Sequence, residues 1–323
     1  MKVLVTGATS LLGAETVKRL LVAGHEVRTF QRNPSSLDTD EVLGNIDDED
    51  AVQAAANGVD AIVHLAALVG VTGQWDDYHR VNVMGTRRVV AAARTNNVER
   101  LVYVSSPSVA HAGSSLAGAG ADPADPDRAR GNYARSKAMA ETHALGTHSG
   151  AAVVAIRPHL VWGPGDIQLV GRIVDRARAG RLAHIGTGTA LIDTIYISNA
   201  ADALVASVER CEELHGKALV VTNGQPRPIG EIIDRIVEAA GLARPTRRVP
   251  ATAAKLGGAG IELYWERSGR QDDPPMTRFV AEQMSTAHWF AQAETRAMLG
   301  WAPAVTLDEG FEALRRWYAD QGS

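Results

Sequence analysis

Residues 2–13, KVLVTGATSLLG, decide the fold. The apolar run 3–5 predicts a buried strand that stops at Gly7, and a helical spacing of apolar residues begins near Leu12. A strand, a glycine turn and a helix start together aim backbone N–H groups and the positive end of a helix dipole at one point, which suits a pyrophosphate. Gly7 permits the tight turn, and Gly13 permits close packing of helix and strand. We therefore predict a nucleotide-binding loop here.

Length and composition limit the class of protein. The 323 residues, 45% of them hydrophobic, suffice for one large α/β unit or two interleaved domains with a sizeable core. The net charge of −4 disfavours a general binder of nucleic acid or of an anionic membrane. A single cysteine excludes an internal disulfide, and a strand at the N-terminus predicts no signal peptide, so we expect a cytoplasmic protein.

Strand-like and helix-like segments alternate along the first half of the chain. Apolar strands separated by helices are typical of a parallel sheet covered on both faces. We predict a doubly wound α/β (Rossmann) fold with a smaller, mostly helical C-terminal substrate lobe. The loop 113–130 is expected at the carboxyl edge of the sheet, where such folds bind ligands. The predicted domains are 1–157 with a returning segment at about 190–212, and a lobe of 158–189 and 213–323; the predicted strands include 26–30, 61–65, 101–105, 152–157 and 218–222, and the predicted helices include 51–56, 78–95 and 133–145.

The end of the second strand bears on the choice of dinucleotide. An NAD site usually places Asp or Glu there to hold the ribose 2′-OH, but this chain has Gln31 followed by Arg32. Arginine can grip a 2′-phosphate, and no carboxylate in this stretch repels it, so we predict NADP(H), with NAD(H) possible. Asn45 and Ile46, after the third strand, can contact an adenine ring; alternatively, the aspartates that follow them cap a helix.

A tyrosine, a lysine and two serines form the candidate catalytic group. Tyr133 and Lys137 are four residues apart in a predicted helix and therefore share a face. We expect the Lys137 ammonium to lower the pKa of Tyr133 while its other donors hold a ribose hydroxyl. Ser105 and Ser106 end a strand, where a hydroxyl can polarise a carbonyl oxygen during proton transfer. Asn82 either serves a proton-relay water near Lys137 or is a satisfied polar group of its helix.

Together these motifs resemble an extended short-chain dehydrogenase/reductase. The resemblance rests on the motifs TGATSLLG, HLAA, N-x-x-G-T, Y-x-x-x-K and RP…GPG. It implies that Ser106, three residues before Val109, forms the catalytic trio with Tyr133 and Lys137, and that a bound nicotinamide supplies a hydride. Ser10 departs from the pattern, because the family usually has glycine there. The cofactor-binding residues implied are Gly7, Thr9, Ser10, Leu11, Leu12, Gly13, Gln31, Arg32, Asn45, Ile46, Leu65, Ala66, Ala67, Tyr133, Lys137, Pro158 and Leu160.

The second half of the chain indicates the substrate class. Leu160 stands where nucleotide-sugar epimerases often have an asparagine that holds a phosphate, which disfavours such a substrate. Stretches 157–166, 193–203 and 274–290 resemble the 3β-hydroxysteroid dehydrogenase-like branch, and most closely its bacterial reductases of 2-alkyl-3-keto acids in long-chain olefin biosynthesis. The resemblance implies reduction of a ketone on a hydrophobic substrate. The alternatives are a sterol dehydrogenase, a nucleotide-sugar epimerase and a non-catalytic NADP(H)-sensing regulator, which the intact trio disfavours.

Further expectations concern the substrate and partners. Residues 251–265 are expected to form a lid, a helix that touches a membrane, or a core helix of the lobe. The family implies a homodimer formed through 78–95 and 133–145. The ten histidines show no metal-ligand spacing, so we expect no metal. The candidate substrate contacts are Trp75, Ser108, His159, Trp162 and Tyr264.

Overall fold

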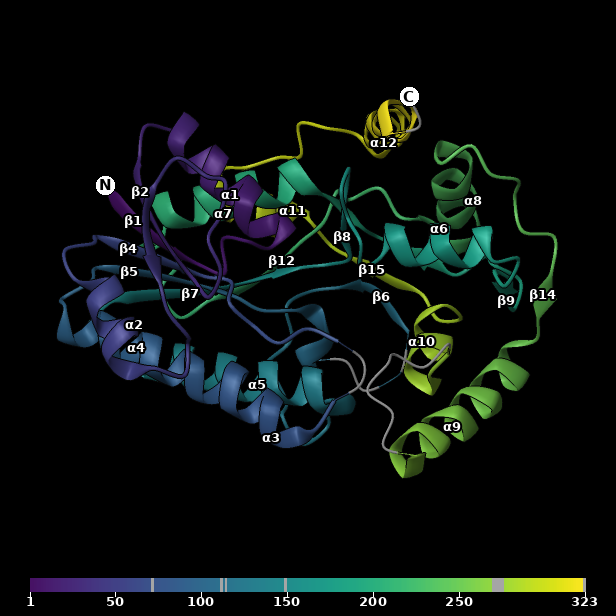
Figure 1. Ribbon diagram of the computed structural model, residues 1–323, viewed down its shortest axis with the longest axis horizontal. Coiled ribbons are helices and arrows are strands. Elements are labelled where there is room, and N and C mark those ends of the chain that lie inside the picture. The colour runs from purple at the N-terminus through teal and green to yellow at the C-terminus, as the bar shows by residue number, and fades with distance from the viewer. Residues whose placement is uncertain (71–72, 111–112, 114, 148–149, 269–275, 322–323) are drawn as a thin grey trace.

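The computed structural model describes residues 1–70, 73–110, 113, 115–147, 150–268 and 276–321. Its centre is a seven-stranded parallel sheet in the order β12-β7-β5-β4-β1-β2-β3 (Figure 1). This order reverses between β1 and β4, as in dinucleotide-binding folds, so the predicted doubly wound sheet is confirmed. The strands are β1 (Lys2–Thr6), β2 (Glu26–Gln31), β3 (Asp40–Leu43), β4 (Ala61–His64), β5 (Arg100–Val104), β7 (Ala152–Pro158) and β12 (Ala218–Val221).

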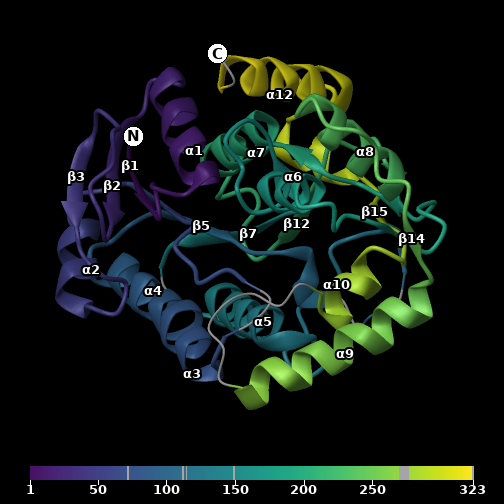
Figure 2. The same ribbon diagram turned by 45° about the vertical axis from the view of Figure 1, so that its right-hand side comes forward.

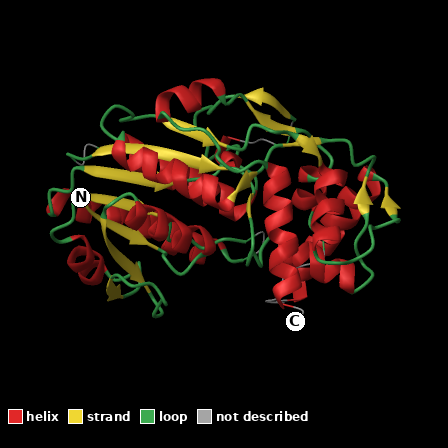
Figure 3. Cartoon of the chain, turned by 90° about the horizontal axis from the view of Figure 1, so that it is seen from above, coloured by secondary structure: helices red, strands yellow, loops and turns green. Residues whose placement is uncertain are grey.

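Helices cover both faces of the sheet (Figures 1 and 3), because its strands are apolar on both sides. Val3 and Val5 belong to the core on one face, whereas Leu4 between them belongs to the core on the other. One face carries α1 (Leu11–Val22), α7 (Ile197–Glu209) and α11 (Ala293–Leu299), and the other carries α2 (Glu49–Ala56), α4 (Gly85–Thr95) and α5 (Gly131–Gly146).

The helix predicted at 78–95 is wound in three consecutive pieces. It begins as α3 (Trp75–Tyr78), widens into the π-helix η1 (His79–Met84) and continues as α4. π-Helical turns are rare and are frequent at functional sites. The π segment contains Asn82, whose contacts are described below.

Two boundaries differ from expectation. Residues 218–221 form β12 in the main sheet, paired along β7, so the predicted lobe boundary after 212 is wrong for this strand. Its buried Leu219 and Val221 complete the apolar face that α7 covers. The predicted loop 113–130 contains a strand, β6 (Leu116–Ala119), which pairs in parallel with β15 (His288–Phe290). This pairing ties the loop to the lobe.

The lobe packs helices and short strands around its own core. Trp162, Ile236 and Phe311 lie in that core. Its helices are α6 (Val170–Arg178), α8 (Ile229–Ala239), α9 (Ala251–Ser268), α10 (Arg278–Gln283) and α12 (Leu307–Gln321). A four-stranded sheet joins β13 (Arg227–Pro228), β10 (Leu191–Ile192), β15 and β6; β8 (Val161–Trp162) pairs with β11 (Ile195–Tyr196), and β9 (His184–Ile185) with β14 (Arg248–Val249).

Helix α9 lies at the edge of the lobe (Figure 2). It packs on α10 through a small apolar cluster that includes Ala254 and Ala281. Its other side exposes Leu256, Leu263 and Tyr264, so the alternative of a core helix is wrong for these three residues. Within the described residues, no helix is both long and apolar enough to cross a membrane. Residues 274–275, at the start of one stretch that carried the resemblance, lie outside the described residues.

Candidate active site

The turn after β1 is closed by Ser10 rather than by a glycine. The Ser10 hydroxyl donates to the carbonyl of Gly7 (2.8 Å) and accepts from the N–H of Gly13 (3.1 Å), so it caps α1. Gly7 has φ +75°, and a Cβ there would lie 2.9 Å from the backbone of Ala66. Within the described part of the chain, the N–H groups of Leu11 and Leu12 at the helix start have no acceptor. This turn therefore fits a dinucleotide phosphate.

Buried hydrogen bonds hold the β4 exit against the turn. The Thr6 hydroxyl accepts from the N–H of Ala66 (3.1 Å) and contacts His64 Nδ1 (2.7 Å), while His64 Nε2 reaches Thr86 Oγ1 (3.1 Å). Burial and the Lys137 charge lower the pKa of His64 to about 3, so the ring stays neutral. His64 is thus a packed structural residue beside the predicted cofactor positions 65–67.

The end of β2 holds a carboxylate that the local sequence does not reveal. Gln31 Nε2 donates to Glu41 Oε2 (2.6 Å), and the N–H and hydroxyl of Ser35 donate to the same oxygen (2.8 and 2.9 Å). These bonds from Ser35, and the weaker one from Gln31, hold the pKa of Glu41 below its usual range. Arg32 is exposed and has no ion-pair partner among the described residues. The premise that no carboxylate lies near Gln31 is therefore wrong in three dimensions, because β3 brings Glu41 alongside.

The stretch after β3 serves a helix cap. Asp48 accepts from the N–H of Ala51 (3.1 Å) and caps α2, which is the alternative left open for this stretch. Ile46 is 6% exposed and packs against Gly85. A Cβ added at Gly85 would lie 2.9 Å from the Ile46 side chain. The Ile46 side chain belongs to the core, and the predicted contact of Asn45 and Ile46 with an adenine stays a prediction. Asn45 remains accessible at the same turn.

Tyr133 and Ser106 meet at the carboxyl end of the sheet. The Ser106 side chain lies close enough to the Tyr133 phenol to lower its pKa, and Ser106 Oγ lies 2.9 Å from Ser108 Oγ. Ser105 is buried, its N–H donates to the carbonyl of Ile156, and its hydroxyl has no hydrogen-bond partner among the described residues, so Ser106 as the catalytic serine stays a prediction. Burial raises the pKa of Tyr133 to about 12, although the Ser106 bond lowers it. The phenol is therefore protonated at neutral pH.

Lys137 follows Tyr133 by one turn of α5 but is not among the groups that shift the pKa of the phenol. Its Nζ donates to the carbonyl of Val104 (2.6 Å) and lies 4.2 Å from the ring centre of Tyr103. Burial lowers the pKa of Lys137 to about 7, while Glu141 raises it. The expectation that Lys137 lowers the pKa of Tyr133 is wrong for this structure, because burial raises that pKa and the group that lowers it is Ser106.

A buried ion pair supports the catalytic helix from behind. Glu141, one turn after Lys137, accepts from Arg157 at 2.5 and 2.9 Å, and both side chains are 1% exposed. Arg157 also donates to the carbonyl of Asp122 (2.7 Å) in the long loop. Sequence reasoning missed this role of Glu141; its spacing of four from Lys137 was the available signal.

The amide of Asn82 is engaged by protein groups. Its Oδ1 accepts from the N–H of Leu68 (2.7 Å), and its Nδ2 donates to the Leu68 carbonyl (3.0 Å) and to Ser136 Oγ (2.9 Å). Ser136 in turn donates to the carbonyl of Tyr133 (2.8 Å). Asn82 is therefore a satisfied helix residue that links the β4 exit to α5, rather than a group aimed at Lys137.

The candidate substrate residues are distributed unevenly. Trp162 is 1% exposed and stacks on Phe311 (4.6 Å between ring centres), so the expectation of a substrate contact is wrong because it packs in the lobe core. His159 is also largely buried, with Nδ1 2.5 Å from the carbonyl of Asp193. Trp75 is half-buried beneath the guanidinium of Arg135. Tyr264 is exposed on α9, Ser108 and Pro158 are half-buried near the sheet edge, and Leu160 is 38% exposed.

A phosphate-binding turn joined to a serine, a tyrosine and a lysine at the edge of a doubly wound sheet is the arrangement of a dinucleotide-dependent oxidoreductase. The model of the NAD dependent epimerase/dehydratase family matches residues 3–222. The chain belongs to this family.

Three similar proteins narrow the comparison. The chain is 39% identical over 326 residues to a 2-alkyl-3-oxoalkanoate reductase of Stenotrophomonas maltophilia (strain K279a), covering 98% of both chains. It is 30% identical over 334 residues to a 3 beta-hydroxysteroid dehydrogenase/Delta 5→4-isomerase of Mycobacterium tuberculosis (strain CDC 1551 / Oshkosh), covering 98% of this chain and 90% of that one. The solved structure of MoeE5 in complex with UDP-glucose and NAD shares the fold, with a TM-score of 0.76, 24% identity and full coverage of both chains.

Proposed function

We propose that this protein is an NADP(H)-dependent reductase that converts a 2-alkyl-3-oxo acid into the 2-alkyl-3-hydroxy acid. The contact between Ser106 and Tyr133 is the observation that supports reduction of a ketone, because it places two hydroxyls together at the edge of the sheet. The reductase from Stenotrophomonas maltophilia supports the substrate class. Leu160 fits an apolar substrate better than a nucleotide sugar, since it cannot hydrogen-bond a phosphate.

The side chains suit proton donation to a ketone. Ser106 and Tyr133 hold the carbonyl oxygen by hydrogen bonds, and Tyr133, protonated at neutral pH, gives it a proton. When bound, the dihydronicotinamide supplies the hydride that the carbonyl carbon accepts, and it is oxidised in the same step. Lys137 is charged below about pH 7, and its remaining N–H donors can then hold a ribose hydroxyl of the cofactor.

The test compares three substrates at saturating NADPH. We expect turnover of a 2-alkyl-3-oxo acid, little or none of a 3-keto sterol, and none of a nucleotide sugar. Tyr133→Phe should lower kcat by about 10²- to 10⁴-fold, the usual contribution of a positioned acid, while NADPH still binds. Sterol turnover alone would favour the steroid dehydrogenase that the mycobacterial relative suggests. A Tyr133→Phe variant with the wild-type rate would refute the proton role.

The preference for NADP(H) over NAD(H) rests on two side chains of opposite charge. The exposed Arg32 favours a 2′-phosphate, and the Glu41 carboxylate beside Gln31 opposes it. Arg32→Ala should weaken NADPH binding by about tenfold and leave NADH binding unchanged. Glu41→Gln should strengthen NADPH binding relative to NADH. Equal effects of either substitution on both dinucleotides would contradict the assignment.

Two association proposals accompany the activity. We propose a homodimer through α4 and α5, whose outer face carries a groove of about 630 Å³ lined in part by Arg87, Arg94 and His143. Because like charges meet there, light scattering should show a stronger dimer at higher salt; a monomer at every salt concentration would refute it.

We also propose that the exposed apolar side of α9 touches membranes, which cosedimentation with vesicles tests. Leu256→Ser should reduce the cosedimentation, and no cosedimentation of the wild type would reject the proposal.

A further inference from the structure

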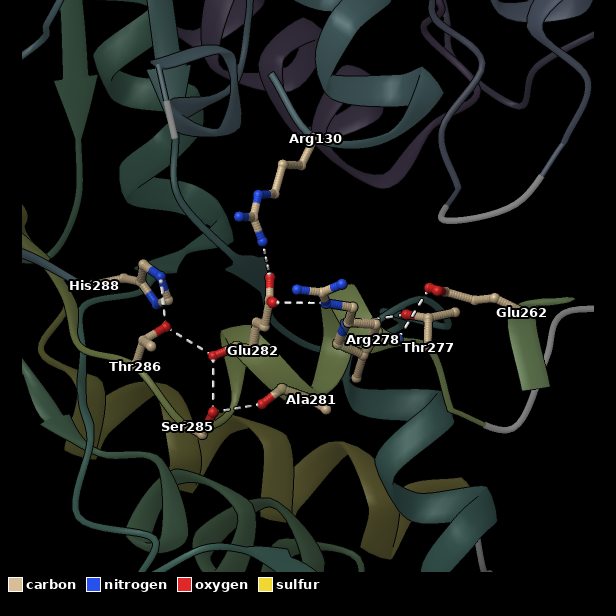
Figure 4. A network of polar contacts seen from close by, with 10 residues as sticks. Arg130, Glu262, Thr277, Arg278, Ala281, Glu282, Ser285, Thr286 and His288 are labelled. Carbon is tan, nitrogen blue, oxygen red and sulfur yellow. Dashed lines mark hydrogen bonds and ion pairs between the residues drawn. The ribbon is translucent and has the colours of Figure 1, made fainter. Parts of the chain in front are cut away.

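Arg130 lies immediately before the helix that carries Tyr133, and its guanidinium points toward Glu282 of α10 (Figure 4). It is the N-cap residue of α5, has an extended backbone, and precedes Tyr133 by three residues in the chain. A Cβ at Gly113, in the loop that follows Ser106, would collide with the Arg130 guanidinium. Arg130 is therefore close to both segments that carry the reacting hydroxyls.

The guanidinium of Arg130 has one partner and spare donors. Its Nη1 donates to Glu282 Oε2 (2.6 Å), and the side chain is 44% exposed. No second acceptor for it lies in the part of the chain that the structure describes. Because a guanidinium carries five N–H donors in a planar fork, Arg130 can still bind a carboxylate in the two-point manner that arginine favours.

Glu282 is shared between two arginines, which makes Arg130 replaceable. Arg278, one turn before Glu282 in α10, donates from its Nε to Glu282 Oε1 (3.1 Å), and Figure 4 shows both guanidinium groups directed at this carboxylate. Glu282 is 9% exposed, so it needs a cation at all times. Glu262 accepts a hydrogen bond from the backbone N–H of Arg278 and not from its guanidinium (Figure 4). Arg278 can therefore keep Glu282 paired if Arg130 turns to a ligand.

The proposed substrate needs such a cation. In a 2-alkyl-3-oxo acid, one carbon separates the carboxylate from the reacting carbonyl, so the carboxylate must lie near Tyr133 and leave water there. A desolvated carboxylate requires a charged hydrogen-bond donor. Lys137 is already engaged with Val104, and Arg135 lies over Trp75. Arg130, at the N-cap of α5, is a cation at this end of the helix that has N–H donors to spare.

We infer that Arg130 binds the carboxylate of the substrate acid, and that Glu282 holds its guanidinium until the acid arrives. The inference rests on the proposed function and adds a specificity residue to it. The site distinguishes an oxo acid from a neutral ketone of the same shape, such as a sterol. Only the acid has a carboxylate that can replace Glu282 as the partner of Arg130.

The experiment compares the oxo acid with its methyl ester, using full-length protein and NADPH. Arg130→Gln should lower kcat/KM for the acid by about 10- to 100-fold, the effect of losing a charged hydrogen bond, mainly through KM. Its activity on the ester should stay within about twofold. Arg128→Gln is the matched control, because Arg128 is exposed in the same loop and its side chain has no partner in the described residues; it should change neither substrate.

Two more variants separate binding from structure. Arg130→Lys keeps the positive charge but lacks the planar fork of donors. Its kcat/KM should fall several-fold on the acid and stay unchanged on the ester. This variant tests the carboxylate site if Arg130→Gln fails to fold. Glu282→Gln should lower KM for the acid, because it removes the competing carboxylate. Equal losses on acid and ester in the Arg130 variants, or a raised KM for both substrates in Glu282→Gln, would overturn the inference by showing a structural clamp. Wild-type protein without oxo-acid activity would instead overturn the proposed function and the carboxylate site with it.

Discussion

Two arginine–carboxylate pairs flank the catalytic residues of α5, and they differ in burial. Arg157 and Glu141 are both 1% exposed and lie behind Lys137, inside the cofactor half. Arg130 is 44% exposed and meets Glu282 between the two halves of the molecule. The first pair has no access to solvent and cannot exchange partners. The second pair can exchange partners. We therefore assign the buried pair to support of the helix and the exposed pair to recognition of the substrate carboxylate.

The comparison extends to the halves that hold the pairs. In the cofactor half, hydrogen bonds between buried side chains link neighbouring elements near the site, as the bonds of Asn82 and His64 illustrate. At the border with the lobe, the pair of Arg130 and Glu282 joins residues 152 apart in the chain, and its arginine is 44% exposed. We infer that the cofactor half fixes the geometry of the chemistry, while the border selects the substrate.

The largest expected contrast concerns stability. Glu141→Gln leaves the Arg157 charge buried without a counter-ion and should lower the free energy of unfolding by about 3–5 kcal/mol. Glu282→Gln should cost only about 0–1 kcal/mol, because Arg130 is well exposed and Arg278 is free to reorient in solvent. Denaturant unfolding of both variants measures the difference. Similar losses in the two variants would remove the distinction between a supporting pair and an exchangeable one.

The next contrast is in the pH profile of reduction. Lys137 has a pKa of about 7, so raising the pH through 7 removes its charge, while Tyr133 with a pKa of about 12 stays protonated. kcat/KM for reduction should therefore fall above about pH 7, with a slope approaching tenfold per pH unit. Because Glu141 raises the pKa of Lys137, Glu141→Gln should move the break to lower pH.

Glu282→Gln is the control for that profile, because Glu282 is not among the groups that shift the pKa of Lys137. Its break should coincide with that of the wild type. A flat wild-type profile between about pH 6 and pH 9 would contradict the role given to Lys137, and a shift in both variants would contradict the separation of the two pairs.

The sequence predicts local features of this site better than contacts between distant segments. The strand and turn at 2–13 and the spacing of Tyr133 and Lys137 follow from periodicity, because short-range geometry determines them. The approach of Glu41 to Gln31 depends on the register between β2 and β3, which no local pattern encodes. The strand in the loop 113–130 was missed for the same reason, since its residues are small and its partner β15 lies far along the chain.

The smallest expected effect concerns strain where the two halves join. Leu160, directly after β7, has φ +47°, a left-handed conformation that costs a leucine about 1 kcal/mol and that asparagine tolerates. Leu160→Asn should raise the free energy of unfolding by about 1 kcal/mol and lower activity on the oxo acid, because a polar group replaces apolar surface beside the site. Leu191→Asn is the matched control, because Leu191 is equally exposed at 38% but has no positive φ. It should bring no gain in stability. If both substitutions change stability equally, the backbone at Leu160 is unstrained. There would then be no energetic cost of leucine at this position for a substrate contact to explain.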